Sequence, residues 1–161
     1  MRVSDEIKIR WAEARDAADI VRLINVAFRA AESFFVEGDR ISAESLQPML
    51  DKGNFLLAED RAGLIGCVLV ELRGERAYFG LLAVDPAQQH RGLGRRLVDE
   101  AENHARAAGC RVMDLRIVNV RAELPTFYRR LGYVETGTEP FPEDVKTKLP
   151  CHFVVMSKAL A

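Results

Sequence analysis

The sequence predicts an α+β fold with a mixed central sheet of about seven strands, flanked by about four helices. Three apolar stretches, residues 55–59, 64–72 and 77–84, are separated by short turns, which is typical of an antiparallel meander. A long amphipathic segment over residues 93–108 follows them and precedes further short apolar stretches. A helix that lies between a meander and later strands indicates an α+β class.

The first part of the chain is predicted to form one strand and two helices. Residues 7–12 alternate between apolar and polar side chains, as a half-buried strand does. A helix follows, with Asp16 as its expected N-cap and an apolar stripe that continues to about Ala31. Ser42 then begins a capping-box pattern, which predicts a second short helix that ends near Asp51.

The pattern after the amphipathic helix predicts a strand, a short helix and two final strands. Residues 111–118 alternate as a strand does, and residues 125–131 suit a helix because proline is tolerated in a first turn. A strand begins at residues 133–135, a polar loop is expected over residues 137–150, and residues 152–157 are the last predicted strand.

Composition limits the class of protein. With 161 residues, the chain is long enough for one self-sufficient core, so we expect a single domain over residues 1–161. The formal net charge of −1 gives no indication of a nucleic-acid or membrane partner. Three widely spaced cysteines and the absence of an apolar leader favour a cytoplasmic protein. No CxxC or HExxH motif occurs, so no metal site is expected.

The stretch between the third meander strand and the amphipathic helix has the composition of an anion-binding loop. Gly92 and Gly94 let the backbone turn sharply or approach a ligand closely. The first amides of the following helix have no partner within the helix, and the helix dipole is positive there. Arg91, Arg95 and Arg96 add fixed positive charge. A phosphate or a pyrophosphate is the expected ligand.

Two well-known phosphate loops do not fit this stretch. A P-loop ends in Gly-Lys followed by Ser or Thr, and no such tripeptide occurs in the chain. A dinucleotide-binding fingerprint needs a third glycine where Leu97 stands. A Rossmann-type domain that binds NAD is therefore disfavoured, and the antiparallel meander argues against it as well.

The whole string Gln89-x-x-Gly92-x-Gly94, after a strand and before a helix, resembles the acyl-CoA-binding motif of the GCN5-related N-acetyltransferase (GNAT) family. Farther along, residues 127–133 (FYRRLGY) are similar to that family's second signature. Asn119 follows the strand between the two motifs. This resemblance implies the GNAT acyl-CoA N-acyltransferase fold.

The resemblance also implies an activity and a cosubstrate. Acetyl-CoA would be the acetyl donor, and a primary amine of a small molecule or a peptide would attack it directly, with no acyl-enzyme. Homodimers are common in the family, so a homodimer is one of the oligomeric states that the resemblance leaves open for this chain. An alternative is a non-catalytic acyl-CoA-binding or sensing module, which keeps the loop but lacks a competent acid and base.

The resemblance further implies which residues bind acetyl-CoA. The pyrophosphate would lie on the glycine-rich loop, and the peptide-like pantetheine arm would pair with the edge of the preceding strand. Such pairing requires a splay or a bulge in that strand. Asn119 would hold the arm from the other side, unless it is a simple helix cap. The expected cofactor-binding residues are Leu82, Ala83, Val84, Gln89, His90, Arg91, Gly92, Leu93, Gly94, Arg95, Asn119, Phe127 and Tyr128.

Tyr128 is the expected general acid, because it stands where the family's proposed acid tyrosine is found. A thiol pKa near 8.5 means that the leaving thiolate needs a proton, and a tyrosine with a pKa near 10 still carries one at neutral pH. Tyr128 as a packed aromatic residue is the alternative. The position of the base in the histone-modifying branch holds Tyr78, not a carboxylate. Glu71 is therefore the expected base, with Glu32 and Glu37 as alternatives.

The acceptor-binding residues are expected in two loops. Phe34, Phe35 and Glu37 follow the first helix, and the polar loop over residues 138–151 occupies the place where relatives form an acceptor pocket. Tyr78 completes the predicted substrate-binding set. For the two phenylalanines, a hydrophobic lid over the core is the alternative.

Overall fold

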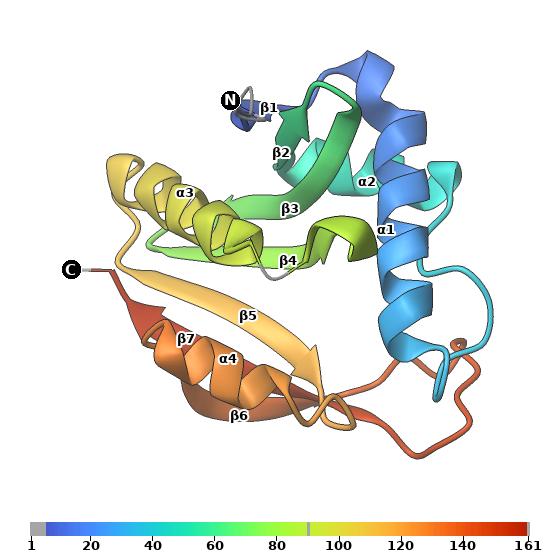
Figure 1. The fold of residues 1–161 in the computed structure, drawn as a ribbon. Helices are drawn as coiled ribbons and strands as arrows, with labels where there is room; N and C mark the ends of the chain where they lie inside the picture. Colours follow the sequence, from blue (N-terminus) through green and yellow to red (C-terminus); the bar gives the residue numbers. More distant parts are fainter. Residues whose placement is uncertain (1–5, 90, 161) are drawn as a thin grey trace.

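The computed structural model describes residues 6–89 and 91–160, which form a seven-stranded sheet in the order β1-β2-β3-β4-β5-β7-β6 (Figure 1). The predicted α+β class and mixed sheet are confirmed. The strands are β1 (Lys8–Trp11), β2 (Asn54–Asp60), β3 (Gly63–Arg73), β4 (Arg76–Val84), β5 (Val112–Val118), β6 (Val134–Pro140) and β7 (His152–Ala159). The helices are α1 (Ala17–Glu32), α2 (Ala43–Lys52), α3 (Leu93–Ala107) and α4 (Leu124–Arg130).

The sheet divides where β4 meets β5. Strands β1 to β4 are antiparallel to their neighbours, whereas β4 and β5 are parallel and are connected through α3. Pairing joins residues 76–78 of β4 to residues 112–114 of β5 and then ends. Figure 1 shows β5 turning away from β4 beyond this point. The two halves of the sheet therefore diverge beyond these paired residues.

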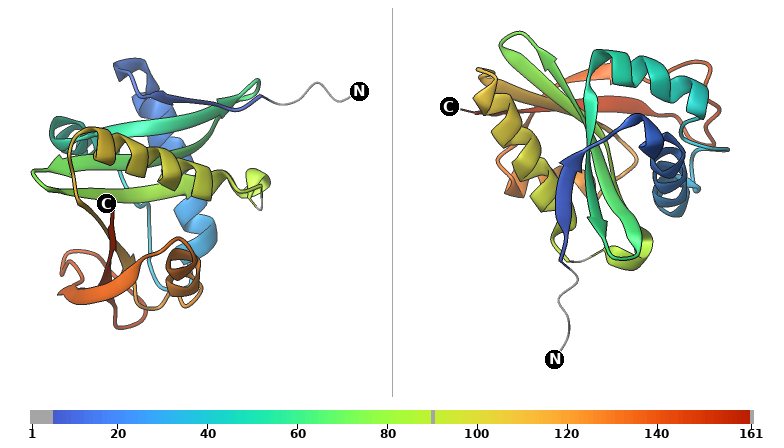
Figure 2. Two further views of the ribbon diagram at one scale, coloured as in Figure 1. Left: turned by 90° about the vertical axis from the view of Figure 1, so that its left-hand side faces the viewer. Right: turned by 90° about the horizontal axis from the view of Figure 1, so that it is seen from above.

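The helices cover the two faces of the sheet in pairs, with α3 and α4 on one face and α1 and α2 on the other (Figure 2). Successive side chains of a strand point to opposite faces, so β3 contributes to both cores. Val68 packs in the core that contains Leu97 of α3, and Leu69 packs in the core that contains Ile24 of α1. We call these two sides the α3 face and the α1 face.

One predicted boundary is wrong. Residues 137–140 belong to β6 and not to the polar loop, since Pro140 of β6 pairs with His152 of β7. Every residue of β6 is exposed, because it is an edge strand, so its sequence lacks the apolar alternation that reveals a half-buried strand. None of the helices in the described part of the chain is long and apolar enough to cross a membrane.

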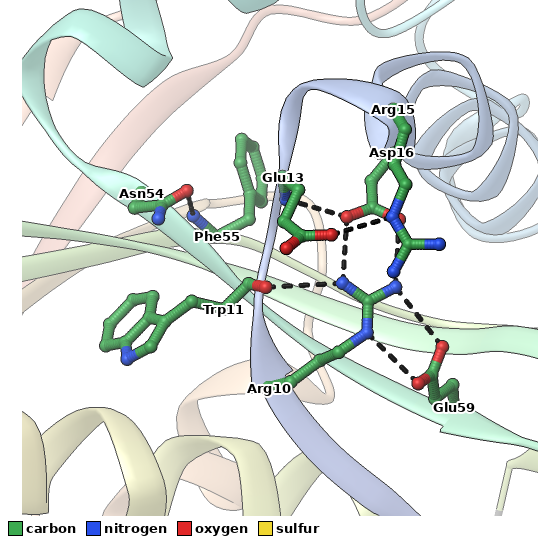
Figure 3. Close-up of polar contacts among 8 residues, drawn as sticks. All are labelled: Arg10, Trp11, Glu13, Arg15, Asp16, Asn54, Phe55 and Glu59. Carbon is green, nitrogen blue, oxygen red and sulfur yellow. Dashed lines mark hydrogen bonds and ion pairs between the residues drawn. The ribbon is translucent and has the colours of Figure 1, made fainter.

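The side chain of Asp16 does not cap α1 as predicted, although the residue stands at the N-cap position. Its two carboxylate oxygens accept hydrogen bonds of 2.9 Å from Arg10 of β1, and one of them also accepts the backbone N–H of Glu13 (Figure 3). Arg10 also bonds Glu59 of β2 at 3.0 Å. The cluster therefore attaches the beginning of α1 to the sheet.

Asp16→Asn should lower the free energy of unfolding by about 1–2 kcal/mol at neutral pH, because the charge-assisted bonds to Arg10 are lost. Those bonds lower the pKa of Asp16 from 3.8 to about 2. The contribution of Asp16 is therefore complete above about pH 4 and declines as the pH falls toward 2. Urea unfolding of both proteins across this range should show the two stabilities converging.

Asp19→Asn is the matched control, because Asp19 is also at the beginning of α1 but pairs with Arg22 on the exposed surface. It should change the stability by less than about 1 kcal/mol. A loss for Asp16→Asn that stays constant from pH 7 to pH 2 would contradict the proposed ion pair.

Candidate active site

A cleft of about 1160 Å³ lies where β4 and β5 diverge. Residues from both faces of the sheet line it. Phe28 and Glu32 of α1 contribute from the α1 face, and Gly94 of α3 and Phe127 of α4 contribute from the α3 face. The gap between the strands is therefore lined from both faces of the sheet.

Strand β4 carries a bulge beside this cleft. Cys67 and Leu69 of β3 pair with Ala83 and Gly80 of β4, so β4 contains one more residue than β3 over this interval. Within the interval, Leu81 has a φ of +50°, a left-handed conformation that is rare for a leucine. Because pairing with β5 has already ended, the bulge and the splay leave a strand edge beside the cleft. The splay or bulge that the sequence analysis required is present.

The glycine-rich loop ends at the N-terminus of α3 and lines the cleft. Gly92 is the N-cap of α3 with a φ of +74°, and a Cβ added there would meet no atom within 4 Å. The first amides of α3, from Leu93 to Arg95, have no partner within the helix. Arg91 bonds Gln88 and does not line the cleft. His90 lies outside the described residues.

Tyr128 of α4 lines the cleft from the α3 face. It is buried, and its ring packs against the rings of Phe79, Phe127 and Tyr133 at centroid distances of 5.0–6.0 Å. Burial raises the pKa of Tyr128 above its usual value, so its hydroxyl is protonated at neutral pH. Tyr128 is thus a packed aromatic residue that also lines the cleft.

Glu71 and Tyr78 face the cleft from the α1 face, where they are partners in the register of β3 and β4. Arg73 bonds the Glu71 carboxylate at 2.8 Å and lies over the Tyr78 ring at 4.5 Å. A Cβ at Gly80 would lie 2.7 Å from the Tyr78 hydroxyl oxygen. The glycine therefore makes room for a phenol that lies along β4 toward the bulge.

Two more carboxylates line the α1 side of the cleft. Glu32, the last residue of α1, is buried and forms an ion pair of 2.9 Å with Arg121. Burial raises the pKa of the Glu32 carboxyl, although Arg121 opposes the shift. Glu37 lines the same region but is exposed.

Some predicted site residues do not line the cleft. Phe35 is fully buried in a small core with Val118 and Phe153, and Phe34 is exposed elsewhere. Phe35 is therefore a core residue, which favours the alternative to acceptor binding. Asn119 accepts the backbone N–H of His152 at 2.8 Å, so this amide oxygen is engaged at the beginning of β7. Ala83 packs its side chain into the α1-face core.

The sequence analysis missed several charged residues that line the cleft. Asp114 and Arg116 of β5 alternate with buried Met113 and Leu115, and this alternation is the signal that could have placed them on one face. Arg40, in the loop between α1 and α2, carried no comparable signal. Among the residues that the structure describes, no cluster of His, Cys, Asp or Glu is arranged to hold a metal ion.

Comparison with known proteins decides the family. Residues 51–135, just over half of the chain, match the family model described as the acetyltransferase (GNAT) domain. This chain belongs to the GNAT family. The match includes the bulged strand, the glycine-rich loop and the second signature, so the predicted family is confirmed.

Individual relatives agree with the GNAT assignment. Glucosamine 6-phosphate N-acetyltransferase 1 from Oryza sativa subsp. japonica is 37% identical over 93 residues, or 52% of this chain and 54% of that protein. The chain thus spans about half the length of this relative. The ribosomal-protein-S18-alanine N-acetyltransferase of Escherichia coli matches with a TM-score of 0.76 at 16% identity, over 97% of this chain and 95% of that one. The yncA protein of Salmonella typhimurium, solved with its cofactor acetyl-CoA, matches with a TM-score of 0.72 at 22% identity, over 97% and 95%. The predicted GNAT fold is confirmed.

Proposed function

We propose that this chain forms one N-acetyltransferase domain, which transfers the acetyl group of acetyl-CoA to a primary amine of a small molecule or a peptide. The observation that carries the proposal is the unpaired edge of β4, which lies beside the N-terminus of α3 in one cleft. The pantetheine arm pairs with residues 82–84, as an added strand does. The pyrophosphate lies on the amides at the N-terminus of α3, where Arg95 adds positive charge.

The reaction proceeds by direct attack across the gap between the strands. The amine nitrogen forms a bond to the acetyl carbon, and backbone N–H groups of β4 stabilise the oxyanion. The carbon–sulfur bond then breaks, which gives the amide and the thiolate of CoA. Glu71 takes the proton that the amine loses, and Tyr128 donates a proton to the thiolate. This division of roles is supported by the position of Glu71 on the α1 face and of Tyr128 on the α3 face.

Glu32 is a second candidate for the base. Burial raises its pKa, which brings its basicity closer to neutral pH than that of an ordinary carboxylate. Its ion pair with Arg121 opposes this role, since the cation stabilises the carboxylate and so makes it a weaker base. Glu71 has a comparable partner in Arg73, so geometry alone leaves both carboxylates as candidates.

The expectation of a reducing compartment such as the cytoplasm is kept as part of the proposal. Cys67, Cys110 and Cys151 are free thiols, which supports it. The alternative of a non-catalytic acyl-CoA-binding module is less well supported, because Tyr128 and the carboxylates line the same cleft. Release of free CoA thiol in the presence of a panel of small amines distinguishes the two, since a binding module releases none.

Gly92→Ala should weaken the binding of acetyl-CoA by about tenfold or more, because a side chain in this left-handed conformation strains the loop and projects toward the ligand. Gly74→Ala is the matched control. Gly74 has a φ of +72° in the β3–β4 turn, and its Cβ would also meet no atom within 4 Å. Both variants should lose similar stability, but the control should bind acetyl-CoA normally.

The binding is measured from the midpoint of thermal unfolding in the presence of acetyl-CoA, CoA or NAD. A ligand at a hundredfold excess over its Kd stabilises a protein by about 2.7 kcal/mol, which raises the midpoint by several degrees. The wild type should respond to acetyl-CoA and CoA but not to NAD. No response to CoA would overturn the proposed function, and equal responses of the two glycine variants would overturn the assignment of the loop.

Tyr128→Phe should lower kcat by about a hundredfold or more and leave the Kd of acetyl-CoA within about twofold, because only the acid is removed. Tyr133→Phe is the matched control from the same aromatic cluster. The Tyr133 hydroxyl donates to buried Glu102 at 2.8 Å, away from the cleft lining, so this variant should lose stability but keep its kcat. Equal kcat values for Tyr128→Phe and the wild type would exclude the acid role.

Glu71→Gln should lower kcat/KM by about a hundredfold, because the carboxylate that accepts the proton of the amine is lost. Glu32→Gln should lower kcat/KM by less than about threefold. The reverse result would assign the base to Glu32, whose pKa is raised by burial.

A further inference from the structure

Two of the arginines that line the cleft have no carboxylate partner among the described residues. Six arginines line the cleft, and four of them form ion pairs of 2.6–3.5 Å. Arg40 and Arg95 form none in the described part of the chain. Arg95 lies in the first turn of α3, where the proposed pyrophosphate accounts for it. Arg40 lies on the α1 face, where it is exposed at the cleft and available to a ligand.

The surroundings of Arg40 do not compensate its charge. Its guanidinium lies 5.6 Å from the centre of the Phe28 ring. Glu32 is the carboxylate that acts on it, and Glu32 is already bonded to Arg121 at 2.9 Å. The positive charge of Arg116 also acts on Arg40, and an anion near both guanidinium groups would offset their repulsion.

Arg116 faces the same region from β5. It lies over the Phe153 ring at 4.3 Å, and its ion pair with Glu139 at 3.5 Å joins two side chains that are 42% and 49% exposed. A pair this long and exposed contributes little, so the guanidinium retains donors for another partner. Arg116 lines the cleft together with Tyr78, beside the proposed acceptor side.

We propose that Arg40 and Arg116 together bind an anionic group of the acceptor, either a carboxylate or a phosphate, so that the preferred substrates are amines that carry a negative charge. The planar fork of a guanidinium matches both groups with two parallel hydrogen bonds. This inference rests on the proposed function, because the acceptor must enter from the α1 face for the two arginines to meet it.

The test compares matched pairs of amines that differ in one anionic group. Glucosamine 6-phosphate is compared with glucosamine, and alanine with alaninamide, by calorimetry on protein saturated with CoA, so that no acetyl transfer occurs. The member of at least one pair that carries the anionic group should bind tenfold or more tightly than the member that lacks it. The phosphate pair and the carboxylate pair show which of the two groups the site prefers.

Arg40→Gln and Arg116→Gln should each reduce this preference to less than about threefold, while the affinity for glucosamine and alaninamide stays the same. Arg22→Gln is the matched control, since Arg22 is an exposed cation of α1 that pairs with Asp19 and does not line the cleft. The control should keep the full preference.

Equal affinities within both pairs would overturn the anion site, as would an equal preference in Arg40→Gln and Arg22→Gln. Neither result would affect the proposed acetyl transfer, which is judged by the response of the thermal midpoint to acetyl-CoA and CoA. A wild-type protein that does not bind CoA would overturn both proposals together.

Discussion

The structure depends on one constraint, which is that β4 stops pairing with β5 after residue 78. Two features maintain the separation. The bulge at Leu81 changes the direction of β4, and the rings of Phe79, Tyr128 and Tyr133 pack together on the α3 face where the strands part. If the two strands continued side by side, their edges would satisfy each other and the cleft would close. A sheet that is incomplete at its centre is therefore the condition for the proposed chemistry.

The sequence predicted most of the fold because most elements have a clear periodicity. The meander strands are apolar stretches bounded by turns, the helix from residue 93 is amphipathic, and glycines marked the loop before that helix. Strand β6 was only partly found, since an exposed edge strand needs no apolar alternation. A splay or a bulge in β4 was expected through the family resemblance alone, and the position of the bulge at Leu81 was not predicted, because its residues are ordinary strand formers.

The candidate site was harder to predict where it depends on contacts between distant segments. Phe35 and Phe34 are neighbours in one loop, but long-range packing against β7 buries the first and leaves the second exposed. Asp16 has the residue type of a cap, yet Arg10 on another element takes its carboxylate. Arg40 and Arg116 are far apart in the sequence, so their common location in the cleft follows from the fold alone.

The two faces of the sheet carry separate cores, and they meet at the gap between β4 and β5. In the proposed reaction, the donor and the acceptor therefore contact largely different sets of side chains. Under that proposal, substitutions in the loop that contains Arg40, or on the α1 side of β5, alter the acceptor side without disturbing the helix proposed to bind the pyrophosphate. Such an arrangement lets substrate choice evolve independently of the acyl donor, as one half of the molecule varies and the other stays fixed.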